Sequence, residues 1–148
     1  MKKKYTILTK ITFAIYLLIV VKFILLRYPV DQMLEWIRRG YYDVPMSINI
    51  IPFKTMAMYM KGEPTIKIAV RNMVGNIIFF MPFGFLVPMI LKEINSYKKI
   101  IIVSFAFSLS LEIAQIMIRV GSFDIDDLIL NTLGAVLGYV LLRKIRAK

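Results

Sequence analysis

Long apolar runs, each interrupted by a few polar residues, occupy most of the chain and predict membrane-crossing helices. A helix needs roughly 20 mainly apolar residues to cross about 30 Å of hydrocarbon. Four stretches approach this length, at about residues 6–26, 73–91, 100–118 and 128–142. The fourth is short, so the preceding "DIDD" is expected to form its first turn, where aspartates suit the positive end of the helix dipole. The pattern predicts one all-α integral membrane domain over residues 1–148, built as a four-helix transmembrane bundle.

The segment between the first two predicted spans is too apolar to be a simple linker. The stretch "DQMLEWIRRGYY" mixes apolar and basic residues, a composition that favours a short helix at the membrane surface. The stretch "INIIPFKTMAMYMKG" is also apolar and is a candidate to dip back into the membrane, where other protein would have to cover its backbone. We therefore expect a long outer loop that is partly helical or re-entrant.

The composition agrees with a membrane protein and removes several kinds of chemistry. Hydrophobic residues make up 59% of the chain and the mean hydropathy is +0.70, whereas soluble domains are about 45–50% apolar. The chain contains no cysteine and no histidine. These absences exclude disulfides and thiolate nucleophiles, and they remove the commonest general base and transition-metal ligand. We expect no metal site and no cofactor.

The net charge of +11 predicts an orientation in the membrane rather than a nucleic-acid partner. With both termini inside the cell, the cytoplasmic pieces contain ten basic residues and one acidic residue, whereas the outer pieces contain eight and seven. Such an excess of Lys and Arg on one side marks the cytoplasmic face. We therefore expect a multi-pass protein of the cell membrane with both termini cytoplasmic. Its basic residues would attract anionic membrane lipids.

Polar residues inside the predicted spans gather near the outer surface. On the third span their spacings of four, four, three and four define one helical face: Ser104, Ser108, Glu112, Gln115 and Arg119. Glu112 would lie about 9 Å below the outer surface, because each helical residue rises about 1.5 Å. The other spans bring polar groups to a similar depth, namely Lys22, Asn72, Asn76, Asp127 and Asn131.

Charged groups at this depth are functional candidates. A buried charge there costs about 2.5–3.5 kcal/mol, so Glu112 is expected to be paired, protonated or in a hydrated cleft, with Lys22 and Arg119 as candidate partners. For Glu112, Arg119 and Asp127 we favour a functional role, and a structural ion-pair network is the alternative.

The other polar and small residues have a structural explanation beside the functional one. The amides Asn76, Gln115 and Asn131 are explained equally well as interhelical hydrogen bonds. Gly134 and Gly138 form a small-xxx-small step that would let another helix approach closely.

Four motifs in order give the chain a resemblance to a known family. They are "NIIPF" (49–53), "GNIIFFMPFGFLVP" (75–88), "SLSLEIAQ" (108–115) and "RVGSFDIDDLILNTLGAVLGY" (119–139). The chain resembles the VanZ-like family, small membrane proteins named for a teicoplanin resistance protein. The resemblance implies a bacterial envelope protein associated with low-level resistance to teicoplanin-type glycopeptides, and it implies no particular reaction. The family motif falls on Asn49, Pro52, Phe53, Asn76, Phe80, Pro82, Phe83, Gly84, Glu112, Gln115, Arg119, Asp127, Asn131, Gly134 and Gly138.

Three functions remain open for this polar cluster, besides a role as the assembly partner of another membrane protein. The first is a non-enzymatic membrane factor that binds a glycopeptide or a lipid-linked cell-wall precursor at the outer leaflet. The second is an enzyme acting on a lipid or wall intermediate, with Glu112 and Asp127 as acid and base and Arg119 stabilising developing charge. The third is a proton-coupled transporter, which at this size would require a homo-oligomer. The candidate ligand-binding residues are Asn49, Asn76, Glu112, Gln115, Arg119, Asp127 and Asn131.

Overall fold

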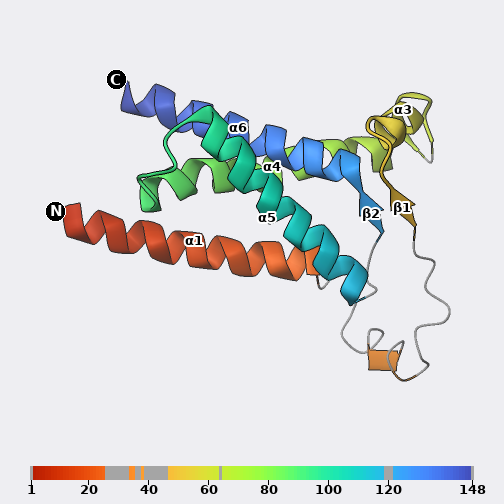
Figure 1. Ribbon diagram of the computed structural model, residues 1–148, viewed down its shortest axis with the longest axis horizontal. Helices are drawn as coiled ribbons and strands as arrows, with labels where there is room; N and C mark the ends of the chain where they lie inside the picture. Colours follow the sequence, from red (N-terminus) through yellow and green to blue (C-terminus); the bar gives the residue numbers. More distant parts are fainter. Residues whose placement is uncertain are drawn as a thin grey trace.

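The computed structural model describes residues 2–25, 34–35, 38, 47–63, 65–118 and 122–147. Within these ranges lie five helices and two short strands: α1 (Lys2–Leu25), β1 (Ile48–Asn49), α3 (Lys54–Met60), α4 (Ile66–Ile90), α5 (Tyr97–Met117), β2 (Phe123–Asp124) and α6 (Ile125–Arg146). The four long helices run back and forth along one direction (Figure 1). Both ends of the chain therefore lie at the same end of the molecule, and the strands and α3 lie at the opposite end.

Three of the described helices are long and apolar enough to cross a membrane. They are α4, α5 and α6, with 25, 21 and 22 residues. At about 1.5 Å per residue each is at least as long as the hydrocarbon core is thick. The predicted first span falls mostly in α1, which packs against α4 but is not among these three. The all-α class is confirmed in the described ranges, and the count of four spans stays a prediction.

The helices begin earlier than the hydropathy pattern predicts because polar side chains cap them. The Ile68 backbone N–H donates to Thr65 Oγ1 at 3.3 Å before α4, and the Lys99 N–H donates to Ser96 Oγ at 3.3 Å before α5. Asp124 caps α6 by accepting from the Asp126 N–H at 2.9 Å. Each cap satisfies an amide that has no partner inside the helix. The prediction that "DIDD" forms the first turn of the last helix is confirmed, since α6 begins at Ile125.

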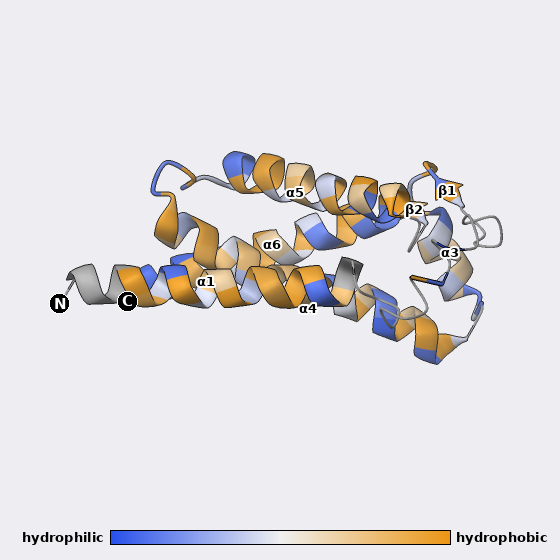
Figure 2. Cartoon of the chain, turned by 90° about the horizontal axis from the view of Figure 1, so that it is seen from below, coloured by the Kyte–Doolittle hydropathy of each residue, from blue (hydrophilic) through white to orange (hydrophobic). Residues whose placement is uncertain are grey.

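The bundle buries several polar side chains of α5 beside an apolar core, and it exposes many apolar side chains on its outer surface. On α5 the buried residues include Ser104, Ser108, Glu112 and Gln115. The same helix exposes Ile101, Ile102, Phe105 and Ile113. Figure 2 shows hydrophobic residues distributed along the lengths of the long helices. An outward apolar surface with an inward polar face is the arrangement expected in lipid, where unsatisfied polar groups are costly.

Glycines hold α4 and α6 in backbone contact. A Cβ placed on Gly134 would lie 2.2 Å from the Ile77 carbonyl oxygen, and one on Gly138 would lie 1.9 Å from that of Met81. On the opposite side, a Cβ on Gly84 would lie 1.7 Å from the Ala135 oxygen. The predicted close approach of another helix at Gly134 and Gly138 is confirmed, and the approaching helix is α4. This contact fixes how the polar residues of the two helices face each other.

The segment between α1 and α4 is partly helical, as predicted, and it also contains a strand that the sequence pattern did not reveal. β1 pairs in parallel with β2, with Ile48 opposite Phe123 and Asn49 opposite Asp124. α3 follows β1 after a short turn (Figure 1). A membrane dip of this loop stays a prediction, and the expected surface helix in "DQMLEWIRRGYY" falls mostly outside the described residues.

Candidate functional site

A cavity of about 570 Å³ opens between the helices in the half of the molecule that carries the strands. Its walls come from α1, α3, α4, α5, β2 and α6, so segments far apart in the sequence contribute to it. The described lining residues are Phe23, Tyr59, Arg71, Asn72, Gly75, Asn76, Phe79, Glu112, Gln115, Ser122, Asp124, Asp127 and Asn131. The volume falls within the roughly 300–1,000 Å³ that is typical of small-molecule sites.

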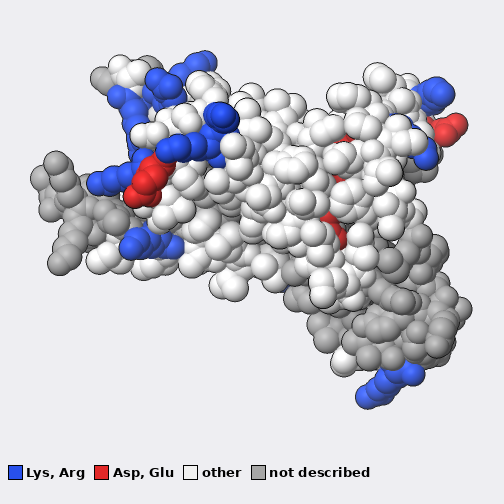
Figure 3. Space-filling view, in the orientation of Figure 1, with Lys and Arg blue, Asp and Glu red and all other residues white. Residues whose placement is uncertain are grey.

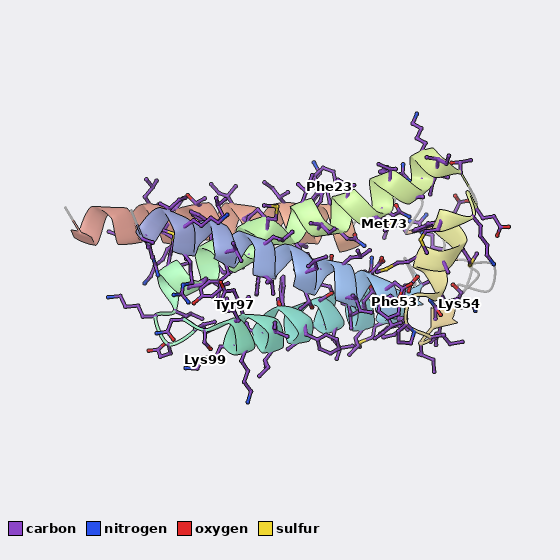
Figure 4. All side chains as sticks on the ribbon, turned by 90° about the horizontal axis from the view of Figure 1, so that it is seen from above. Phe23, Phe53, Lys54, Met73, Tyr97 and Lys99 are labelled. Carbon is purple, nitrogen blue, oxygen red and sulfur yellow. The ribbon has the colours of Figure 1, made fainter. Side chains whose placement is uncertain are left out.

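Asp126 holds α3 against the start of α6, beside this cavity. Its carboxylate is 1% exposed and accepts hydrogen bonds from the backbone N–H groups of Phe53 and Met56, at 2.5 and 3.0 Å. These amides belong to the N-terminal end of α3, where helical partners are lacking. Phe53 itself has a φ of 66°, a left-handed conformation that side chains other than glycine rarely adopt. The bond to Asp126 helps to keep the chain in this turn. Figure 4 shows Phe53 and Lys54 at the start of α3.

Asp124 adds a second connection between the same segments. Its Oδ1 accepts from Asn49 Nδ2 at 3.0 Å and its Oδ2 accepts from Thr55 Oγ1 at 2.5 Å. Asn49 Nδ2 also donates to Thr55 Oγ1 at 3.0 Å. Two carboxylates of "DIDD" therefore fasten β1 and α3 to the beginning of α6. This role differs from the helix-dipole role predicted for them, although Asp124 also serves as the α6 cap.

Glu112 is connected to Asp124 by a hydrogen bond from the Asp124 backbone N–H. The side chain is 5% exposed, and its Oε2 accepts from the Asp124 N–H at 3.2 Å. The predicted partner Lys22 is exposed near the end of α1 and is not among the described residues that line the cavity. The other predicted partner, Arg119, lies outside the described residues.

Three carboxamides are oriented by hydrogen bonds at the cavity wall. Asn76 Nδ2 donates to Asp127 Oδ1 at 2.6 Å, which joins α4 to α6. Asn131 Nδ2 donates to Ser108 Oγ at 2.8 Å, which joins α6 to α5. Asn72 Nδ2 donates to the Tyr59 hydroxyl at 2.7 Å, which joins α4 to α3. The expected interhelical bonds of Asn76 and Asn131 are therefore present, and both residues line the cavity as well.

Most of the predicted site residues meet in this cavity. Asn76, Glu112, Gln115, Asp127 and Asn131 all line it. Asn49, the remaining described candidate, lies on β1 and holds the loop to Asp124 instead of lining the cavity. Arg119 belongs to the undescribed stretch 119–121.

Several lining residues were not predicted as ligand-binding residues. Tyr59, Arg71, Ser122 and Asp124 were missed, and Asn72 was noted only for its depth. Tyr59 and Arg71 fall in the segment that was predicted to be the outer loop. Hydropathy does not indicate which residues of a loop line a cavity. Asn72, one turn before Asn76 on the same helical face, carried a signal that could have identified it.

The arrangement can bind a polar group among many hydrogen-bonding side chains. Three carboxylates, four carboxamides and two hydroxyl groups line the cavity, while Arg71 is the single cation among the described lining residues. In the part of the chain that the structure describes, no group of three or more acidic residues is placed to hold a metal ion. Glu112 and Asp127 place two carboxyl groups in the wall of the same cavity.

The inward polar face, the apolar outer surface and the three long apolar helices define a multi-pass helical membrane protein with a polar cavity toward one end. The chain belongs to the VanZ/LLP1 family, whose model matches residues 13–146. It is 36% identical over 95 residues to Protein VanZ of Enterococcus faecium, an alignment that covers 64% of this chain and 52% of that protein. The chain thus spans about half the length of this curated relative. No solved structure matches it.

Proposed function

We propose that this protein is an envelope membrane factor that lowers susceptibility to teicoplanin-type glycopeptides by binding a ligand in the polar cavity. The ligand would be the glycopeptide itself or a lipid-linked cell-wall precursor. The observation that carries the proposal is the shared cavity, because five of the seven candidate ligand-binding residues line it. Membership of the VanZ/LLP1 family supports the association with glycopeptide resistance.

The proposal places the cavity at the outer face of the cell membrane. Lys and Arg side chains gather at the end of the molecule that holds both termini, as Figure 3 shows on one face. That end includes Lys92, Lys98, Lys99, Arg143, Lys144 and Arg146. An excess of basic residues favours the cytoplasmic side. The opposite end, with the strands, α3 and the cavity, would then face the wall, where glycopeptides and lipid-linked precursors meet the membrane.

A second candidate is an enzyme that acts on a lipid or wall intermediate. It is favoured by the presence of Glu112 and Asp127 in one cavity, since two carboxylates can serve as acid and base. Glu112 accepts the Asp124 backbone N–H and Asp127 accepts from the Asn76 amide, so hydrogen bonds hold both carboxyl groups in place.

Teicoplanin susceptibility of cells that express the chain tests the proposal. The wild type is expected to protect, and Asn76→Ala is expected to reduce protection by about threefold or more, because a hydrogen bond of about 0.5–1.5 kcal/mol would be lost from the site. Ser110→Ala is the control, since Ser110 is exposed on α5 and donates to the Phe107 carbonyl of the same helix. All variants are compared at equal amounts in the membrane.

Carboxylate-to-amide variants separate the two candidates. Glu112→Gln and Asp127→Asn are expected to keep protection if the protein acts by binding, because the amides preserve the shape of the side chain and one carbonyl acceptor while they remove acid and base chemistry. Loss of protection in both, with normal insertion, would favour the enzyme. Full protection by Asn76→Ala, or no protection by the wild type, would contradict the proposed function.

A further inference from the structure

We infer that the cavity recognises a saccharide, an uncharged group rich in hydroxyls. This inference rests on the proposed function, in which the cavity binds an envelope ligand, and it names the part of that ligand that is held. Two features of the wall carry it: the mixture of hydrogen-bond donors and acceptors, and a pair of aromatic rings.

The wall offers both donors and acceptors. Each carboxamide of Asn72, Asn76 and Asn131 has two amide protons and a carbonyl oxygen. The hydrogen bonds described above use one proton of each and fix the plane of the amide. The amide oxygens can accept from sugar hydroxyls, while the remaining amide protons can donate to them. A hydroxyl both donates and accepts, so a saccharide matches this mixture better than a group with acceptors alone.

An aromatic pair supplies the apolar surface that a sugar ring requires. Phe23 of α1 and Phe79 of α4 both line the cavity, with ring centroids 5.4 Å apart and planes inclined by 54°. Their faces can cover the C–H side of a pyranose ring, whose edge carries the hydroxyls. Figure 4 shows Phe23 at the end of α1, beside α4. Asn72 and Asn76 of α4 and Asn131 of α6 line the same cavity and supply its amide groups.

The test compares three probes that differ only in the head group. The full chain, purified into phosphatidylcholine nanodiscs, is titrated with hexyl β-glucoside, hexyl phosphate and hexylammonium, and binding is measured by ligand-detected NMR. Saturable binding of the glucoside, tighter than that of the two charged probes, is the expected result. Asn76→Ala and Gln115→Ala are each expected to weaken it by about tenfold, as for a lost hydrogen bond at the upper end of the usual range. Ser110→Ala is expected to bind like the wild type.

Two kinds of result would overturn the inference. One is tighter binding of hexyl phosphate or hexylammonium, or equal binding of all three, which would mean that charge or the alkyl chain decides. The other is unchanged glucoside binding in both cavity variants, or no saturable glucoside binding at all. The proposed function is judged separately, by drug susceptibility. Protection that depends on Asn76 without any glucoside binding would overturn the saccharide assignment and leave the proposed function standing.

Discussion

Replacing Gly84 with valine is expected to separate α4 from α6 and to destabilise the protein by more than about 3 kcal/mol, the range of severe overpacking. Even a single Cβ at this position would lie 1.7 Å from the Ala135 carbonyl oxygen and 2.5 Å from the carbonyl carbon. The obstacle is backbone, which cannot turn aside as a flexible side chain would. The thermal unfolding temperature of the detergent-solubilised protein measures the effect.

Gly75→Ala is the matched control for this experiment, because Gly75 lies on the same helix. A Cβ at Gly75 would meet nothing within 4 Å, and alanine favours helix over glycine by about 1 kcal/mol. The control is therefore expected to unfold at the wild-type temperature or slightly above it. Equal unfolding temperatures for Gly84→Val and Gly75→Ala would show that the two helices do not meet at Gly84 as described.

Removing the Asp126 carboxylate is expected to release α3 from the bundle. Asp126→Ala deletes both acceptors of the Phe53 and Met56 N–H groups. Hydrogen bonds to a carboxylate contribute about 1.5–3 kcal/mol each. Amide hydrogen exchange in residues 53–60 is therefore expected to accelerate by about 100-fold, since 1.4 kcal/mol corresponds to about tenfold.

A graded series sharpens this experiment. Asp126→Asn keeps one carbonyl acceptor and is expected to give an intermediate rate, whereas Glu93→Gln, at an exposed acid near the termini, is expected to leave α3 unchanged. Exchange in residues 53–60 that is equally fast in the wild type and Asp126→Ala would contradict the proposed anchoring.

The helices and the polar cluster were predictable because both depend on local, periodic signals. Spacings of three and four along residues 104–115 place the polar groups of α5 on one face. Because polar groups are costly in lipid, such a face indicates the side of the helix that turns toward the protein interior. The early start of α4 was missed because Lys67 and Arg71 lower the hydropathy of its first two turns. The capping side chain of Thr65, not hydropathy, determines where this helix begins.

The strand pair and the loop anchors were not predictable from local patterns. β1 and β2 contain two residues each and are separated by more than 70 positions, so no alternation of apolar and polar residues could reveal them. For the same reason Asp126 appeared to be a residue of the helix terminus, whereas its carboxylate caps α3, a helix about 70 residues earlier in the chain. Asn49 was predicted to bind ligand because of its place in a motif. In the structure its side chain donates a hydrogen bond to the Asp124 carboxylate.

The proposed function is tested most directly by determining on which side of the membrane the cavity opens. The chain has no cysteine, so a single introduced thiol can be labelled without background. Ser122→Cys places it at the cavity wall, where Ser122 is exposed, and Asn95→Cys places it in the exposed turn between α4 and α5. With a membrane-impermeant maleimide, Ser122→Cys is expected to react in intact cells and Asn95→Cys only after permeabilisation. The opposite pattern would put the cavity in the cytoplasm and contradict a ligand taken from the outer surface.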